Sequence, residues 1–163
     1  MTATEQSIEL ARAAARAASD KLALNVTAID VSDRLAITDI FFIASAETER
    51  QVNAIVDGIE DELHKFDLRP VRREGRSGGR WVLLDYADIV VHVQHEEDRV
   101  FYALERLYGD CPVIDLQLGE LDPSAKSAGI RAGTGADTGA DAQSDTAAAT
   151  ETDVPANAQA NKN

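Results

Sequence analysis

The stretch that decides the fold is RWVLLDYADIVVHVQHEEDRVFYALERLY, residues 80–108. Two runs of β-branched, aliphatic and aromatic residues, 81–84 and 89–93, flank the short polar segment 85–88. Apolar runs around a polar turn predict a β-hairpin. Three acids beginning at Glu96 then favour a helix start. The helix that follows is expected to pack through apolar residues at helical spacing, namely Val100, Phe101, Leu104, Leu107 and Tyr108.

The hairpin has two different faces. A two- or four-residue loop predicts the pairs Leu84 with Ile89, Val82 with Val91, and Trp81 with His92. One face is then aliphatic and belongs to the core: Val82, Leu84, Ile89, Val91 and Val93. The other face is mixed: Trp81, Leu83, Val90, His92 and Gln94. A three-residue loop would exchange the faces of one strand. Trp81 is therefore either a core residue or the anchor of a contact surface.

The residues before this stretch predict a helix, two strands and a second helix. Their expected ranges are a helix over 4–23 with a thin apolar stripe, a strand over 26–31, a strand over 37–46 covered on both faces, and a helix from Thr48 to Pro70. Gln51 stands in the capping-box position of that second helix. A Gly/Arg-rich connection that need not be ordered follows, over 71–80. The order predicts a mixed α/β (α+β) domain with a mixed sheet of about four strands and three main helices.

The composition changes near residue 117, and this change sets the domain boundary. The eight aromatic residues of the 163-residue chain all lie between Phe41 and Tyr108. The later sequence is rich in Ala, Gly, Thr and Asp, which cannot bury enough apolar surface to offset chain entropy. We therefore expect a single compact domain over residues 1–116 and a disordered acidic tail over 117–163.

Charge and cysteine content narrow the possible partners. The net charge is −13, and residues 1–116 account for −9 of it. Phosphate backbones repel such a chain, so a basic protein surface is a better partner than naked nucleic acid. Cys111 is the only cysteine, which excludes a disulfide framework and a multi-cysteine zinc site. With no signal-like start and no apolar run of about 20 residues, the expected location is cytoplasmic, away from membranes.

Several polar groups are candidates for chemistry. Four carboxylates lie in or beside the expected strands and could together hold Mg²⁺ for phosphoryl transfer: Asp30, Asp39, Asp85 and Asp88. The favoured alternative is that they cap turns. His92, His95 and Glu96 have a metal-like spacing, but the two histidines should point to opposite faces of a strand. We therefore expect no resident metal.

Two further features are open to a functional reading. Four arginines lie in or beside the Gly-rich connection and could contact phosphate, or form a solvated loop: Arg72, Arg73, Arg76 and Arg80. Tyr102 lies opposite the apolar stripe of the last helix, near Arg99, and belongs either to a solvated face or to a contact patch with Trp81.

Four segments of the chain resemble the ribosomal silencing factor family, also called the iojap family. They are ALNVTAIDVSD at 23–33, TDIFFIASAETERQVNAI at 38–55, Glu74-Gly75, and the opening stretch from Arg80. The combination of TD-x-F-x-I with W-V-L-L-D-x-x-D-x-V-V-H-V and R-x-x-Y-x-L-E is specific, and the similarity runs from about residue 3 to 116. The chain looks like a bacterial member with a C-terminal extension.

This resemblance implies a translational repressor without catalytic activity or a cofactor. Members bind the fourteenth protein of the large ribosomal subunit at the intersubunit face and block joining of the small subunit when nutrients are scarce. The implied fold resembles a nucleotidyltransferase scaffold without its active site, and the implied oligomer is a homodimer. No sequence-specific nucleic-acid binding is expected. The family's contact positions fall on Trp81, Tyr102, Asp85, Asp88, His92 and Arg99. The alternative is a metal-dependent nucleotidyl- or phosphoryl-transfer enzyme that uses Asp39, Asp85 and Asp88.

The chain departs from the family pattern at two positions. The hairpin usually reads D-x-G-D, but Ala87 stands where the family has Gly, which disfavours a turn with φ > 0 at that residue. The last helix usually ends L-W, and here it ends Leu107-Tyr108. We expect these changes to alter affinity rather than function.

Overall fold

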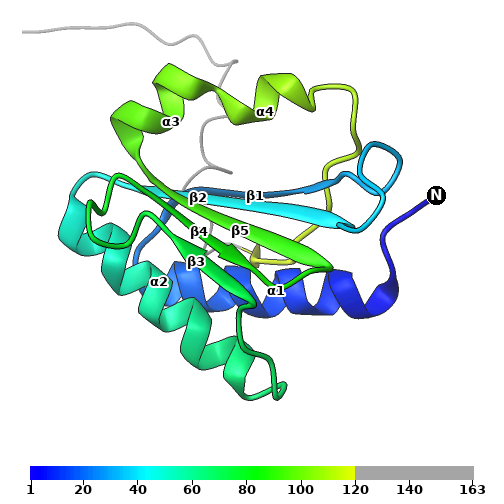
Figure 1. Ribbon diagram of the computed structural model, residues 1–163, viewed down its shortest axis with the longest axis horizontal. Helices are drawn as coiled ribbons and strands as arrows, with labels where there is room; N and C mark the ends of the chain where they lie inside the picture. Colours follow the sequence, from blue (N-terminus) through cyan, green and yellow to red (C-terminus); the bar gives the residue numbers. More distant parts are fainter. Residues whose placement is uncertain (120–163) are drawn as a thin grey trace, which may run out of the picture. The chain divides into compact units, whose positions relative to one another are not determined.

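The computed structural model describes residues 1–119. Its elements are α1 (Glu5–Asp20), β1 (Leu24–Asp30), β2 (Ile40–Ala46), α2 (Glu49–His64), β3 (Arg72–Glu74), β4 (Trp81–Asp85), β5 (Ile89–His95), α3 (Glu96–Tyr102) and α4 (Leu104–Leu107). Helices α1 and α2 lie on one side of the sheet, and α3 and α4 lie on the other (Figure 1). Among the described helices, none is long and apolar enough to span a membrane.

The sheet has five strands in the order β1-β2-β5-β4-β3. Strands β2 and β5 are parallel, and all other neighbours are antiparallel, so the predicted mixed α/β class is confirmed. The fifth strand is β3, which lies in the Gly/Arg-rich connection over 71–80, where no strand was predicted. All three of its residues are exposed at the sheet edge, so they show none of the apolar alternation by which a strand is recognised.

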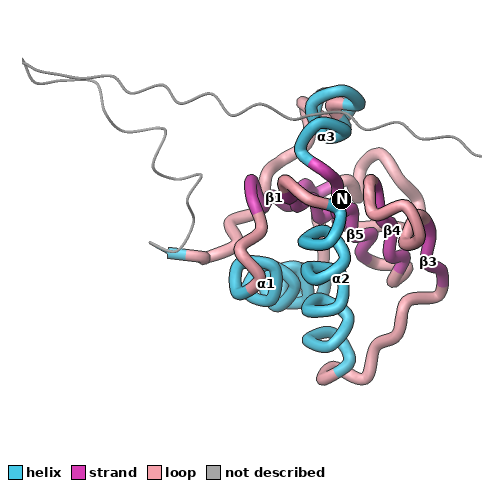
Figure 2. The backbone as a smooth tube through the Cα atoms, turned by 90° about the vertical axis from the view of Figure 1, so that its left-hand side faces the viewer, coloured by secondary structure: helices cyan, strands magenta, loops and turns pink. Residues whose placement is uncertain are grey.

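Helix α1 buries a wider face than the predicted thin stripe. Its inner surface includes Leu10 and six alanines, and all of these alanines except Ala17 have no exposed surface. Small side chains let a helix approach its neighbours closely, so α1 packs against α2 and the sheet although few of its side chains are large (Figure 2). The helix begins after Thr4, whose hydroxyl accepts a hydrogen bond from the Ser7 N–H.

Helix α2 begins where the sequence predicted and ends earlier. The Thr48 hydroxyl accepts a hydrogen bond from the Gln51 N–H. The apolar residues at helical spacing after it are buried, namely Val52, Ile55, Val56, Ile59 and Leu63. The Gln51 side-chain amide does not form the reciprocal capping-box bond to the Thr48 main chain. It donates instead to the Leu22 carbonyl and so links α2 to the end of α1. The last helical residue is His64, well before Pro70, so Phe66 lies beyond the helix and is half exposed.

The predicted faces of the hairpin are confirmed, but its predicted register is wrong by two residues. The observed pairs include Trp81 with Gln94, Val82 with Val93, and Leu84 with Val91. Tyr86 donates its N–H to the Ile89 carbonyl, so the loop is Ala87-Asp88 rather than the expected polar segment 85–88. A shift of two residues keeps every side chain on its face. All five aliphatic residues of the predicted core face are therefore buried.

The predicted single last helix is wrong. It breaks at Ala103, which has a left-handed backbone with φ 45° between α3 and α4. Leu104 is buried as expected, but Val100, Phe101 and Leu107 are exposed. Arg99 occupies the inward position of α3 because its guanidinium bonds to groups beneath the helix, which turns the apolar side chains outward.

The segment after α4 lies along the outer edge of β1. Val113 forms a bridge with Ile29, and the Ile114 N–H donates to the Ala28 carbonyl. Leu116 is buried, and Leu118 also packs against the main core, two residues beyond the predicted domain end at 116. The predicted disordered tail over 117–163 lies outside the described residues from position 120 onward.

Candidate functional site

The side of the sheet opposite α1 and α2 is only partly covered. Near β1, α4 closes a small second core made of Ile29, Val31, Ile43 and Leu104. Toward β4 and the hairpin, the floor of this side consists of Phe41, Trp81, Leu83, Val90 and His92, and we call it the open face. Trp81 and Leu83 are each partly exposed there, so the open face combines apolar surface with a rigid sheet beneath it.

Trp81 is held in place by His92. The indole N–H donates to His92 Nδ1 at 3.1 Å, and His92 is only 5% exposed. Burial lowers the pKa of His92 from 6.5 to about 4. Because an indole nitrogen is a donor only, the bond requires an unprotonated Nδ1, which agrees with a neutral imidazole. The Phe41 ring packs edge-on against the imidazole, with centroids 5.0 Å apart.

Three aromatic side chains form a continuous row from the sheet to the outside of α3. The Trp81 and Tyr102 ring centroids are 4.9 Å apart, and so are those of Tyr102 and Phe101. Exposure rises along this aromatic row, to 52% at Tyr102 and 79% at Phe101. The sequence assigned Phe101 to packing, so it was missed as a candidate. Its exposure follows from the inward position of Arg99.

The charged groups beside the aromatic row are paired. Arg80, the residue before β4, contacts Asp98 at 2.7 Å and Glu97 at 3.0 Å in the first turn of α3. This cluster ties α3 to β4 and places the aromatic row above the strand. It also places two carboxylates beside the apolar surface, as in the polar rim of a protein interface.

The arginines predicted as a possible phosphate-binding cluster are also engaged with acids of the domain. Arg73 contacts Glu60 at 2.8 Å, and Arg76 pairs with Asp57. Arg72 contacts Glu74 at 3.4 Å. Each of these guanidinium groups therefore has a carboxylate beside it, and the local charge is balanced rather than basic.

Asp85 and Asp88 lie at the hairpin end of the open face, at the far end of β4 from Trp81. Asp85 accepts a hydrogen bond from the Ala87 N–H at 2.8 Å, which stabilises the tight turn, and contacts Arg72 more loosely at 3.9 Å. The main-chain carbonyl of Asp88 accepts bonds from Asp39 and Ile40, which joins the hairpin to the start of β2.

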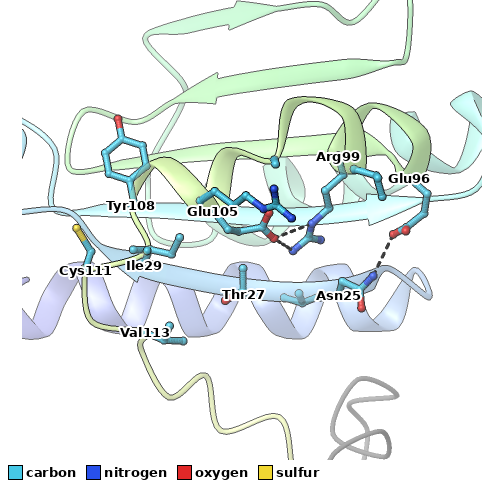
Figure 3. A pocket seen from close by; sticks show the side chains of 14 residues that line it. Asn25, Thr27, Ile29, Glu96, Arg99, Glu105, Tyr108, Cys111 and Val113 are labelled. Carbon is cyan, nitrogen blue, oxygen red and sulfur yellow. Dashed lines mark hydrogen bonds and ion pairs between the residues drawn. The ribbon is translucent and has the colours of Figure 1, made fainter.

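Arg99 lies beneath α3, away from the open face. Its side chain is inserted toward β1 and β2, where it contacts the Ser45 hydroxyl at 3.0 Å and the Leu24 carbonyl at 3.4 Å. Figure 3 shows its contact with Glu105. The residue is 7% exposed and borders a groove between β1 and the α3–α4 pair. Its geometry suits a side chain that positions α3 and thereby the aromatic row.

The carboxylates considered for a metal site make separate local bonds. Asp39 accepts hydrogen bonds from the Thr4 N–H and the Ser7 hydroxyl at the start of α1. Burial raises the pKa of Asp39, but these bonds outweigh it and leave the pKa below its ordinary value. Asp30 accepts from the Ala3 N–H. In residues 1–119, no group of three or more His, Cys, Asp or Glu side chains is placed to hold a metal ion.

The histidines of the metal-like spacing are occupied separately as well. His92 accepts from Trp81, and His95 Nδ1 accepts from the Glu97 N–H as the N-cap of α3. The spacing His92, His95, Glu96 therefore reflects a strand that runs directly into a helix, with each imidazole bonded to a different donor.

Known proteins resemble this chain over nearly the whole described region. Residues 4–152 match the sequence model of the family described as "Ribosomal silencing factor during starvation". The ribosomal silencing factor of Bacillus subtilis is 39% identical over 106 residues, which cover 65% of this chain and 90% of that protein. The chloroplastic protein Iojap of Zea mays is 31% identical over 102 residues, covering 63% of this chain and 44% of that protein.

Solved structures have the same fold. A crystal structure of a Chromobacterium violaceum protein aligns with a TM-score of 0.60 and 30% identity, covering 62% of this chain and 84% of that one. A Bacillus halodurans protein aligns with a TM-score of 0.58 and 34% identity, covering 66% of this chain and 97% of that one. Together with the family match, these similarities show that the chain belongs to the ribosomal silencing factor family.

Proposed function

We propose that this protein represses translation by steric exclusion. It binds the large ribosomal subunit through the fourteenth protein of that subunit, at the intersubunit face, and so prevents the small subunit from joining during starvation or stationary phase. The aromatic row and the open face make the contact. The family is named for a regulatory role, and the proposal assigns this chain the same kind of role without a chemical step or a cofactor.

The aromatic row is the observation that carries this proposal. Large aromatic side chains dominate the binding energy of protein interfaces, especially where they are held rigidly. Trp81 is fixed by its bond to His92, and Tyr102 and Phe101 stack outward from it. A row of this kind loses little conformational entropy on binding, because its members already contact one another in the free protein.

Charge supports a protein partner over an RNA partner. Residues 1–116 carry a net charge of −9, which favours encounter with a basic protein and opposes contact with rRNA phosphates. The arginines near β3 are paired with acids of the domain, so they provide no basic patch for phosphate. The proposed contact therefore includes no sequence-specific reading of nucleic acid.

The contact positions expected from the sequence have different roles in this proposal. Trp81 and Tyr102 contact the partner directly, while His92 fixes the indole from below. Asp85 and Asp88 form the acidic edge at the hairpin end. Arg99 positions α3 through its bonds beneath the helix.

The proposal includes two expectations that come from the family resemblance. We expect the protein to act in the cytoplasm, where ribosomal subunits meet, and to form a homodimer when free. Sedimentation equilibrium of the full chain distinguishes a dimer from a monomer, and the same measurement with added large subunits shows which form binds.

Co-sedimentation with purified ribosomal subunits tests the proposal. The wild-type protein should sediment with large subunits and not with small ones. Trp81→Ala should weaken binding by about 2 kcal/mol, roughly thirtyfold. Phe101→Ala, which removes a mostly exposed ring and so leaves the fold intact, should weaken it about tenfold. Phe66→Ala, an exposed aromatic that follows α2, should bind as wild type.

Two results would refute the proposal. One is wild-type protein that does not sediment with large subunits at micromolar concentration. The other is Mg²⁺-dependent turnover of a nucleotide by the purified protein, which would favour the transferase alternative. Normal binding by both Trp81→Ala and Phe101→Ala would remove the aromatic row from the contact.

A further inference from the structure

A hollow of about 350 Å³ lies on the open face at its hairpin end. Its lining includes Phe41, Leu83, Val90 and His92 from three adjacent strands, and the loop Leu35–Thr38 before β2 forms one wall. Arg72 and Asp85 stand on the opposite side. The hollow is thus an apolar depression with one ion pair at its border, on the same side of the sheet as the aromatic row.

Ile37 stands in the wall of this hollow, and it is 81% exposed. Its loop is anchored at both ends. At its start, the Leu35 N–H donates to the Val31 carbonyl at 2.9 Å. At its end, the Asp39 carbonyl accepts from the Val31 N–H at 2.8 Å, and the Asp39 main-chain N–H donates to the Asp88 carbonyl. Leu35 packs into the second core, which directs the loop so that Ile37 remains in water. Covering an exposed isoleucine side chain removes apolar surface from water and therefore favours binding.

The hollow is continuous with the proposed contact surface. His92 lines the hollow and also accepts the hydrogen bond from Trp81, so the hollow adjoins the aromatic row. One partner surface can therefore cover the aromatic row and the hollow together. The ion pair at the border is loose, with Arg72 and Asp85 separated by 3.9 Å. Asp85 can therefore accept a second cation, and the domain's net charge of −9 favours a partner that supplies one.

We infer that this hollow receives an aliphatic side chain, adjacent to a Lys or Arg, from the basic protein surface that the aromatic row contacts. The inference rests on the proposed function and adds a second anchor point to it. The aliphatic side chain packs between Ile37 and Leu83, and the neighbouring cation contacts Asp85. The two anchors lie at opposite ends of β4, so together they fix the orientation of the protein on its partner.

A matched pair of neutral substitutions tests the inference. Ile37→Asn removes the exposed aliphatic wall of the hollow. Leu22→Asn removes an aliphatic of similar exposure, 75%, after the end of α1, and asparagine tolerates the positive φ at that position. Neither protein should melt below the wild-type temperature, because neither side chain is buried and asparagine relieves the positive φ at position 22. In co-sedimentation with large subunits, Ile37→Asn should bind about tenfold more weakly, and Leu22→Asn within about twofold of wild type.

The outcomes separate this inference from the proposed function. If Phe101→Ala weakens binding and Ile37→Asn does not, the hollow is outside the contact and the inference is wrong while the proposed function stands. If wild-type protein does not bind large subunits, the proposed function fails and the inference fails with it. Equal losses for Ile37→Asn and Leu22→Asn would also overturn the inference, since the effect would not belong to the hollow.

Discussion

Lowering the pH from 7 to 5 should destabilise the protein through His92. In the folded state, burial lowers the pKa of His92 from 6.5 to about 4, and Nδ1 accepts the Trp81 indole N–H. The unfolded chain binds a proton on this histidine at its ordinary pKa. Between the two values, the unfolded state therefore holds more protons than the folded state, and the free energy of unfolding falls as the pH falls.

The size of the effect follows from the two pKa values. Their separation corresponds to about 3 kcal/mol, and about 2 kcal/mol of this is lost between pH 7 and pH 5. The carboxylates with lowered pKa, such as Asp39, lose their contribution only near or below pH 4, outside this window. The contribution of His92 to the free energy of unfolding is complete above its unfolded pKa. It is lost progressively as the pH falls from that value toward the folded pKa.

Urea unfolding of the wild type and of His92→Asn, measured from pH 7 to pH 5, tests this reasoning. Asparagine keeps an oxygen near the position of Nδ1 and does not titrate. The difference in the free energy of unfolding between the two proteins is free of groups that titrate equally in both. The stability advantage of the wild type should shrink by about 2 kcal/mol on acidification. A difference that stays constant within about 0.5 kcal/mol over this range would show that His92 is not held neutral.

Three further predictions concern the backbone and the N-terminal helix. Ala87 has φ 66° in the hairpin loop, so Ala87→Gly should raise the free energy of unfolding by about 1 kcal/mol in urea titrations. Gly75→Ala should lower the free energy of unfolding by more than about 2 kcal/mol, because its Cβ would lie 1.9 Å from the Trp81 carbonyl oxygen. The control Gly78→Ala meets no atom closer than 3.9 Å and should change the free energy of unfolding by less than about 0.5 kcal/mol. Asp39→Ala removes the carboxylate that accepts hydrogen bonds from Thr4 and Ser7 at the start of α1. It should lower the melting temperature and reduce the free energy of unfolding by about 2 kcal/mol.

Properties that depend on periodicity could be predicted from the sequence. The two faces of the hairpin follow from alternation, and a register error of two residues left them unchanged. The start of α2 follows from Thr48 and the apolar spacing after it. These features are local, so neighbouring residues contain the information that determines them.

The break in the last helix could not be predicted, because a distant contact decides it. The apolar residues from Val100 to Tyr108 fit one continuous helix, and nothing local marks Ala103 as a left-handed residue. Arg99 bonds to Ser45 and to the Leu24 carbonyl, more than 50 residues away in sequence. This tertiary contact outweighs local helix propensity and turns Phe101 to the surface, where it becomes part of the candidate site.

The open face was predicted only in part for a similar reason. Trp81, Tyr102, His92 and Asp85 were identified from the sequence, and the structure places all four on or beside this face. Ile37 was assigned to a strand, but the strand begins at Ile40. The preceding loop is shaped by bonds to the hairpin and to the end of β1, which no pattern within the loop reveals.

Joining of purified ribosomal subunits is the most direct test of the central claim. Large subunits are incubated with increasing amounts of the full-length protein, small subunits are added, and joined particles are measured by light scattering or on sucrose gradients. The account predicts that joining falls in proportion to the fraction of large subunits occupied, and that Phe101→Ala needs about tenfold more protein for the same inhibition. Undiminished joining of large subunits that are saturated with the wild-type protein would contradict the account.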